Sequence, residues 1–179
     1  MENDDILLWS KDYFLKWSDF KASSNPSAFE DSSSCIKFHY IWMVNSTVHE
    51  DKIYFEIYDI KLHTQFLRHL SWVRKGQSSM DLLKHEQGHF DLTEMERSSI
   101  TEKIQKKFHA RKFPTIGQNE EQQKQFAREQ SGIMIAKELE KLFLDLIQKR
   151  KKYDEDTEFG HNKIIQNEYD LKFDSFRKK

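Results

Sequence analysis

The chain has little of what marks several classes of protein. Its one cysteine, Cys35, excludes an intrachain disulfide framework and a zinc site built on cysteine thiolates. No apolar run approaches the roughly 20 residues that a membrane-spanning helix needs. The formal net charge is only −1, so the chain lacks the basic surplus typical of proteins that bind nucleic acid or anionic membranes. We therefore expect neither a transmembrane segment nor a nucleic-acid partner.

The first residues also lack the basic and apolar stretch of a signal peptide, because they read Met1-Glu2-Asn3-Asp4-Asp5. This start predicts a cytoplasmic protein as written, or a periplasmic or cell-envelope protein if a leader has been removed. The length suits a single domain, residues 1–179. Charged residues make up 33% of the chain, yet 14 Phe and 4 Trp can supply a hydrophobic core.

The first third of the chain, residues 1–62, reads mainly as strands. Residues 35–45 alternate between apolar and polar positions, and residues 52–62 alternate again, which predicts an antiparallel pair. We expect residues 52–60 to form an edge strand that could bind an extended peptide through main-chain hydrogen bonds. Between these signals and the N-terminus, the serine-rich residues 22–34 read as a surface loop.

Two long helices are expected downstream, over residues 78–108 and 125–157. Apolar residues recur in both at helical spacing, and neither Pro26 nor Pro114 interrupts them. The basic run at residues 149–152 reads as a solvated helix end, and residues 170–179 read as a frayed tail. The predicted fold class is α+β, with N-terminal antiparallel strands packed on the first of these helices and the second long helix after it.

The most informative motif lies on the first helix and reads His85-Glu86-Gln87-Gly88-His89, an instance of H-E-x-x-H. Residues four apart share one helix face, so both imidazoles can reach one metal ion. Both project within about 40° of each other on the buried stripe at 100° per residue. Burying these polar groups without partners is costly, which favours a metal site with Glu86 as the base that activates water. Gly88 weakens the helix by about 1 kcal/mol and marks a close approach or a functional site.

A catalytic zinc ion usually has three protein ligands, so a third is needed. On the same helix, Asp91 and Glu94 point away from the face of the two histidines, and Glu96 lies about 10 Å too far along the axis. Downstream, Asp154 continues the apolar face of the second helix, where a carboxylate must be paired or bound to a metal. His161 and Glu140 are the alternatives. Asp91 is better suited to orienting a neighbouring group.

Two stretches resemble a bacterial domain family of unknown function whose members are regarded as zinc-dependent proteases of the zincin type. The first stretch is Leu82-Leu83-Lys84-His85-Glu86-Gln87-Gly88-His89-Phe90-Asp91, close to the family run L-x-H-E-Q-G-H-F-D. The second is Tyr153-Asp154-x-x-Thr157-x-x-Gly160, followed by Gln166 and Tyr169. The likeness covers about half of the chain. One departure is Phe159, because the family often has a histidine before the glycine, whereas this chain has His161 after it.

The residues and the resemblance together predict a zincin-like zinc metallopeptidase acting on a peptide or protein substrate. We expect His85, His89 and Asp154 or His161 to bind Zn²⁺, and Glu86 to take a proton from the attacking water. Tyr153, His161 and Tyr169 are the candidates to donate to the oxyanion. Two alternatives stay open. One is a zinc-binding module that holds peptide or protein partners without cleaving them, and the other is a structural interaction protein without metal.

Overall fold

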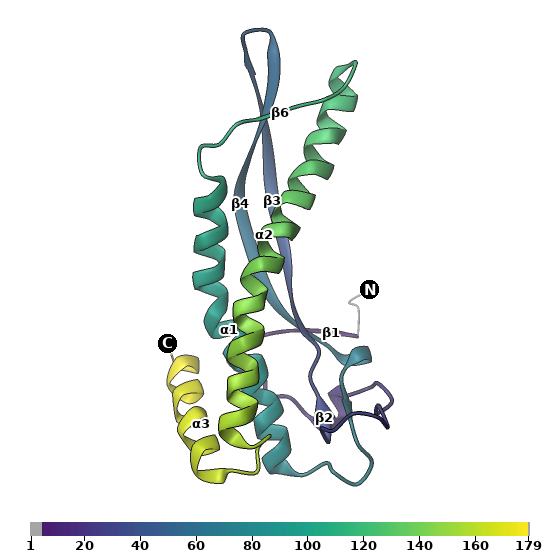
Figure 1. Ribbon diagram of the computed structural model, residues 1–179, viewed down its shortest axis with the longest axis vertical. Helices are drawn as coiled ribbons and strands as arrows, with labels where there is room; N and C mark the ends of the chain where they lie inside the picture. The colour runs from purple at the N-terminus through teal and green to yellow at the C-terminus, as the bar shows by residue number, and fades with distance from the viewer. Residues whose placement is uncertain (1–4, 179) are drawn as a thin grey trace. The chain divides into compact units, whose positions relative to one another are not determined.

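The computed structural model describes residues 5–178 and has an α+β architecture (Figure 1). All strand pairings that it records are antiparallel. Three α-helices lie in the described part of the chain: α1 (Met80–Phe108), α2 (Glu120–Thr157) and α3 (Lys163–Arg177). The strands are β1 (Ile6–Leu8), β2 (Ser32–Ser33), β3 (Ile36–His49), β4 (Lys52–Leu67), β5 (Trp72–Val73) and β6 (Phe113–Pro114). Short 3-10 turns occupy Trp17–Asp19 and Arg68–Leu70.

The chain divides into two compact units. The first contains Met1–His39, His63–Arg97 and Leu146–Lys179, and the second contains Tyr40–Leu62 and Ser98–Asp145. The long elements β3, β4, α1 and α2 each contribute residues to both units. The sequence pattern gave no sign of this division, because the hydrophobic periodicity of each long element runs through the boundary without a break.

The first unit has a core formed by the N-terminal segment, the end of β4 and the start of α1. Its central members are Leu15, Phe20, Ile36, Phe66, Leu83 and Phe90, with Trp9, Trp17 and Val73 packed against them. Strand β1 pairs with β4 in the register Ile6↔Leu67, and β2 pairs with β5 in the register Ser32↔Val73. The remaining segments between residues 9 and 31 are mostly irregular, so the first third of the chain has fewer strands than the sequence pattern predicted.

The second unit buries the alternating face of β4 against helical residues. Phe55, Ile57 and Ile60 are almost fully buried, as are Ile104 and Phe108 of α1 and Ile135 of α2. The ring of Phe55 contacts Phe113 and Phe126, and Trp42 of β3 donates a 2.8 Å hydrogen bond from Nε1 to Ser131 Oγ. The strand prediction for residues 35–45 and 52–62 is therefore confirmed.

Strand β4 lies inside its sheet, whose order is β1-β4-β3. On the side away from β3, β6 pairs with Tyr54 and Phe55, and Gln105 donates a 2.9 Å hydrogen bond to the carbonyl of Ile60. The prediction that residues 52–60 form an open edge for peptide binding is wrong, because these contacts occupy the backbone groups that a peptide would need.

The two long helices follow the prediction closely, whereas the C-terminus does not. Helix α1 begins two residues after the expected start, and α2 begins five residues before its own. Residues 163–177, in contrast, form the helix α3 instead of the frayed tail expected from residue 170 onwards. Asn162 caps this helix by accepting a hydrogen bond from the backbone N–H of Ile165, and Phe173 and Arg177 are buried. The basic residues near the C-terminus led to the prediction of a frayed tail, although apolar residues recur at helical spacing among them.

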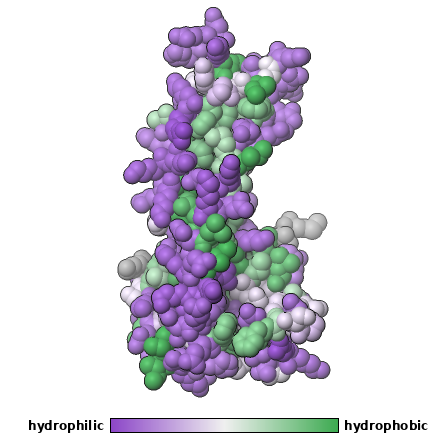
Figure 2. Space-filling view, viewed as in Figure 1, coloured by the Kyte–Doolittle hydropathy of each residue, from purple (hydrophilic) through white to green (hydrophobic). Residues whose placement is uncertain are grey.

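Hydrophilic residues cover most of the face in Figure 2, and apolar residues form scattered patches on it. This agrees with the mean hydropathy of −0.85. Within residues 5–178, no helix combines the length and the apolar character that crossing a membrane requires.

Candidate metal centre

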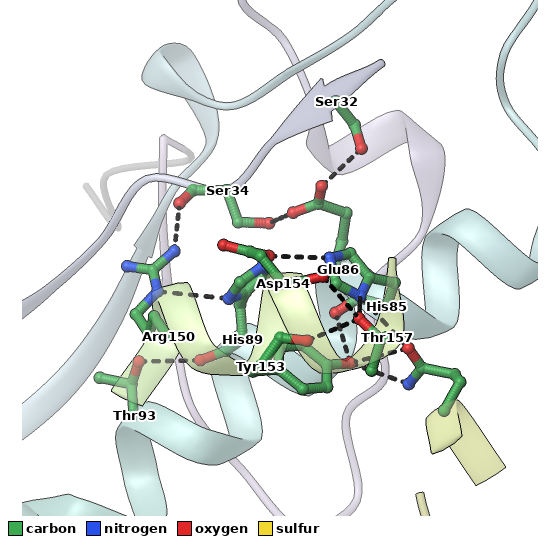
Figure 3. Close-up of polar contacts among 11 residues, drawn as sticks. Ser32, Ser34, His85, Glu86, His89, Thr93, Arg150, Tyr153, Asp154 and Thr157 are labelled. Atoms are coloured by element: carbon green, nitrogen blue, oxygen red, sulfur yellow. Dashed lines mark hydrogen bonds and ion pairs between the residues drawn. The ribbon is translucent and has the colours of Figure 1, made fainter. Parts of the chain in front are cut away.

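His85 and His89 lie one turn apart on α1, and Asp154 reaches them from the last turns of α2 (Figure 3). Asp154 Oδ1 is 3.1 Å from His85 Nε2 and 2.8 Å from His89 Nε2. The three potential ligand atoms all lie within 4.8 Å of one another. All three residues belong to the first unit, and both imidazoles are buried, as their place on the apolar stripe predicted. The structure thus brings together the three residues that the sequence selected.

These groups open into a pocket of about 610 Å³. Its lining includes the two histidines, Glu86, Asp154, Arg150 and His161. Phe29 and Phe159 form an aromatic pair with ring centroids 6.0 Å apart, and both belong to the same lining. The pocket gives a small molecule or a peptide side chain access to the cluster.

The orientation of His85 is set by its other ring nitrogen. Gln166 donates from Nε2 to Asp170 Oδ1 at 2.7 Å, and this hydrogen bond fixes the orientation of the Gln166 amide group. The amide oxygen of Gln166 then lies 3.2 Å from His85 Nδ1. The hydroxyl of Thr157 donates to the carbonyl of Tyr153 and so can only accept from Nδ1, at 3.3 Å. Both neighbours of Nδ1 are acceptors, so Nδ1 carries the proton.

A neutral His85 therefore turns the lone pair of Nε2 towards the carboxylate of Asp154. Two acceptors 3.1 Å apart need a shared proton or a cation between them. An imidazole that donates its second N–H to a polar partner while Nε2 stays free is the arrangement that metal-binding histidines adopt. The donor set of two imidazoles and one carboxylate fits zinc and several other divalent ions.

His89 has a different neighbour. Its Nδ1 accepts a 3.3 Å hydrogen bond from Nε of Arg150, which leaves the ring proton on Nε2, facing Asp154. A metal ion at Nε2 would move that proton to Nδ1, where it would face the guanidinium donor. His89 thus fits the metal-bound form once the contact with Arg150 is released.

Burial and pairing shift the pKa values of this cluster in definite directions. Burial lowers the pKa of His89 and outweighs the opposing hydrogen bond to Asp154. For Asp154, burial alone would raise the pKa, but the neighbouring imidazoles of His85 and His89, which stabilise the charged carboxylate whenever they present an N–H to it, outweigh burial and hold the pKa well below its usual value. Burial likewise lowers the pKa of Arg150, against the attraction of Glu86 and Asp154. The cluster therefore keeps its carboxylate ionised and favours a neutral His89.

Glu86 is buried and lines the pocket, and both of its carboxylate oxygens accept hydrogen bonds. The hydroxyl of Ser32 donates to Oε1 at 2.5 Å, and the hydroxyl of Ser34 donates to Oε2 (Figure 3). Sequence reasoning missed both serines, because a serine-rich segment is typical of a surface loop. Three consecutive serines show no alternation in the sequence, so the alternating burial of Ser32, Ser33 and Ser34 is visible only in the structure.

Arg150 was also missed, since it lies in the basic run that we read as a solvated helix end. Its guanidinium contacts His89 and donates from Nη2 to the carbonyl of Ser34 at 3.0 Å. The neighbouring Lys149, Lys151 and Lys152 are exposed, so the interpretation holds for them and is wrong for Arg150 alone.

Tyr153 does not face the pocket. It is fully buried, stacks on His85 with ring centroids 4.7 Å apart, and donates from its hydroxyl to the carbonyl of His85 at 3.1 Å. Burial raises its pKa far above the usual value. The hydroxyl of Tyr169 donates to Asp156 at 2.8 Å. Tyr153 therefore supports His85. Neither tyrosine is placed to donate a hydrogen bond to an oxyanion in the pocket.

The two alternative ligands lie outside the cluster. His161 is exposed and lines the pocket, but the group of potential metal ligands does not include it. Glu140 is exposed and belongs to the second unit. Of the three predicted third ligands, only Asp154 lies beside both histidines.

Gln87 and Asp91, which belong to the extended motif, have structural partners. Gln87 accepts the backbone N–H of Leu15 at 2.7 Å and donates to Asp91 at 3.0 Å. Asp91 also accepts from Trp9 and forms two hydrogen bonds with Arg177. Asp91 lies outside the group of potential ligands, and it orients Gln87 and connects the N-terminal segment and α3 to α1.

Two glycines allow the close packing around His85. A Cβ on Gly88 would lie 2.1 Å from the hydroxyl oxygen of Tyr153, and one on Gly160 would lie 2.9 Å from His85 Cβ. Gly160 also has a φ of 85°, in a turn where Glu158 and Phe159 take positive φ as well. The expectation that Gly88 marks a close approach is confirmed.

Comparisons of the chain with protein-family models, with curated proteins and with solved structures gave no match. The likeness to the bacterial domain family thus stays a prediction from the two motifs, and the argument about function depends on the geometry of the site.

Proposed function

We propose that this protein is a zinc-dependent metallopeptidase of the zincin type that hydrolyses peptide bonds in a peptide or protein substrate. The observation that carries the proposal is the convergence of His85, His89 and Asp154 beside Glu86 in one pocket. These three residues would hold the metal ion. The order of the motif on α1 supports the zincin assignment, because H-E-x-x-H supplies two ligands and a base from one helix face.

The reaction follows from the positions of the side chains. When bound, zinc supplies Lewis acidity, which polarises a carbonyl and acidifies water. Glu86 lines the same pocket as the two imidazoles, takes the proton from the attacking water and passes it to the leaving amine. His161 lines the same pocket and is the remaining candidate, of the three we considered, to donate to the developing oxyanion.

One observation favours a second candidate, a peptide-binding module that holds metal without cleaving its partner. Phe159 stands where the family often has histidine, and it packs edge-on against Phe29 at the pocket. This pair gives the pocket an apolar wall suited to holding a side chain. Both candidates share the metal centre and differ in turnover.

The first test is the metal content of protein purified without chelator or histidine tag. We expect about one zinc ion per chain, retained in Glu86→Gln and lost in His85→Ala and Asp154→Ala, because a catalytic site needs three protein ligands. His161→Ala tests whether His161 is the third ligand instead of Asp154, and this variant should retain zinc. Zinc-free protein that takes up no added zinc would contradict the proposal.

The second test is cleavage of a fluorescence-quenched peptide library by the zinc-loaded protein. Glu86→Gln should lower the rate by about 10²-fold or more, since a general base contributes that much. Equal cleavage by wild type and Glu86→Gln would point to a contaminating protease, and cleavage by neither would favour the peptide-binding module.

A further inference from the structure

The segment that covers Glu86 has an alternating pattern of three serines. Ser32 and Ser34 are 5% and 6% exposed, whereas Ser33 between them is an exposed residue at the rim of the pocket. The two buried hydroxyls donate to different oxygens of the Glu86 carboxylate. Both oxygens of one carboxylate are thus fixed by two side chains of one short segment, which consists of strand β2 and the residue that follows it.

This strand is fastened on several sides. Strand β2 pairs with β5 at Ser32↔Val73, and the backbone N–H of Arg74 donates to the carbonyl of Asp31 at 2.7 Å. Beyond the strand, the backbone N–H of Cys35 donates to Ser71 Oγ at 2.9 Å. Arg150 then holds the carbonyl of Ser34 from α2. The two hydroxyls are therefore set by the fold and not by a mobile loop.

A glutamate has three rotatable bonds, and a base works only when its carboxylate is held at the position of the water. Each carboxylate oxygen can accept two hydrogen bonds, so one acceptor position per oxygen remains after the serines have donated. The serines thus hold Glu86 without removing its capacity to accept a proton.

We propose that Ser32 and Ser34 are positioning residues, which hold the carboxylate of Glu86 in the orientation that a base needs at this metal centre. The inference rests on the proposed function, because it assigns that base. This positioning role differs from a merely structural one. In a structural role, the serines would only supply hydrogen bonds to a buried carboxylate, and the orientation of Glu86 would not matter.

The experiment uses acetohydroxamate, a small zinc ligand whose N–H and O–H can donate to a neighbouring carboxylate, so that no peptide substrate is needed. Its affinity for the zinc-loaded protein is measured by calorimetry in wild type, Glu86→Gln, and the double variant Ser32→Ala with Ser34→Ala. Ser33→Ala is the matched control on the same strand, and Ser32→Thr with Ser34→Thr restores the hydroxyls. Zinc content is measured for each.

We expect the double alanine variant to keep its zinc and bind acetohydroxamate about tenfold more weakly, in the same direction as Glu86→Gln. Ser33→Ala should bind like wild type, and the threonine variant should recover most of the affinity. Wild-type affinity in the double alanine variant would overturn the proposal. The single variants Ser32→Ala and Ser34→Ala give the same comparison if the double variant does not fold.

Crystal structures of metal-free wild type and the double or single alanine variants supply a readout that does not depend on zinc. The proposal predicts one orientation of Glu86 in wild type and a displaced or multiple orientation in the variants. An unchanged Glu86 would overturn it. Wild type that binds no zinc contradicts the metallopeptidase proposal, whereas an unmoved Glu86 in variants of a zinc-binding wild type contradicts the serine proposal alone.

Discussion

Gly88 illustrates how a single residue serves the site by having no side chain. In most helices a glycine costs stability relative to alanine, and here the missing Cβ is the space that the Tyr153 hydroxyl occupies. That hydroxyl donates to the carbonyl of His85, within the same turn of α1. The glycine therefore lets a buried aromatic ring pack against the helix turn that carries His85.

This arrangement predicts that Gly88→Ala destabilises the protein although alanine is the better helix former. The new methyl group would lie 2.1 Å from the Tyr153 hydroxyl oxygen and 2.7 Å from Cζ, so overpacking should cost about 1–3 kcal/mol or more. Urea denaturation measures the change. The cost should be smaller when Gly88→Ala is introduced into Tyr153→Phe, which removes the closest atom. A stabilised Gly88→Ala would contradict this packing.

Sequence reasoning selected the three candidate ligands that the structure brings together, but not all of their neighbours. Asp154 was selected by counting back to Ile147 on an apolar face, yet Ile147 is 43% exposed, and the buried stripe runs through Leu146 and Tyr153. Asp154 lies at the margin of that stripe, close enough for the prediction to hold. Ser34 and Arg150 could not be found in this way, because polar residues in polar segments carry no periodic signal of burial.

Among the elements, α3 departs most from the prediction. Its basic end suggested a frayed tail, but Ile165, Tyr169, Phe173 and Phe176 recur at the three- and four-residue spacing of a helix face. Phe173 is buried beside Tyr153, and Phe176 contacts Trp9. Arg177 completes the docking by donating to Asp91 and to the carbonyls of Ser10, Lys11 and Tyr13.

We predict that Arg177→Met destabilises the protein by about 3–5 kcal/mol, since it leaves the buried carboxylate of Asp91 without its cation. Lys178→Ala is the matched control, because this neighbouring residue is exposed and should change stability little. Chemical denaturation measures both. Equal stability of the two variants would show that α3 is not held through Asp91.

At the scale of the whole molecule, the buried cluster links stability to pH. The pKa of His89 is lowered in the folded protein, so the unfolded chain binds a proton first as the pH falls. Its contribution to stability is therefore fully present above pH 6.5, the ordinary value for histidine, and is lost as the pH falls below it. Asp154, whose pKa is also lowered, adds a second loss below about pH 4.

The melting temperature of the metal-free protein should accordingly fall between pH 7.5 and pH 5.5. His89→Gln should reduce this dependence, and His109→Gln, which alters an exposed histidine of the second unit, should leave it unchanged. Thermal unfolding followed by circular dichroism at several pH values provides the measurement. A melting temperature that rises towards pH 5.5 would have the wrong sign for a buried neutral His89.

The fit between Gly88 and Tyr153 also has an evolutionary consequence. A larger residue at position 88 is tolerable only if the ring opposite becomes smaller, and a smaller ring would withdraw the donor from the His85 carbonyl. Neither position can drift alone without loss, so substitutions at the two should be inherited together. A lineage that no longer needs the His85 carbonyl held in place would tolerate the smaller ring, and paired change at these positions would be an early trace of that change.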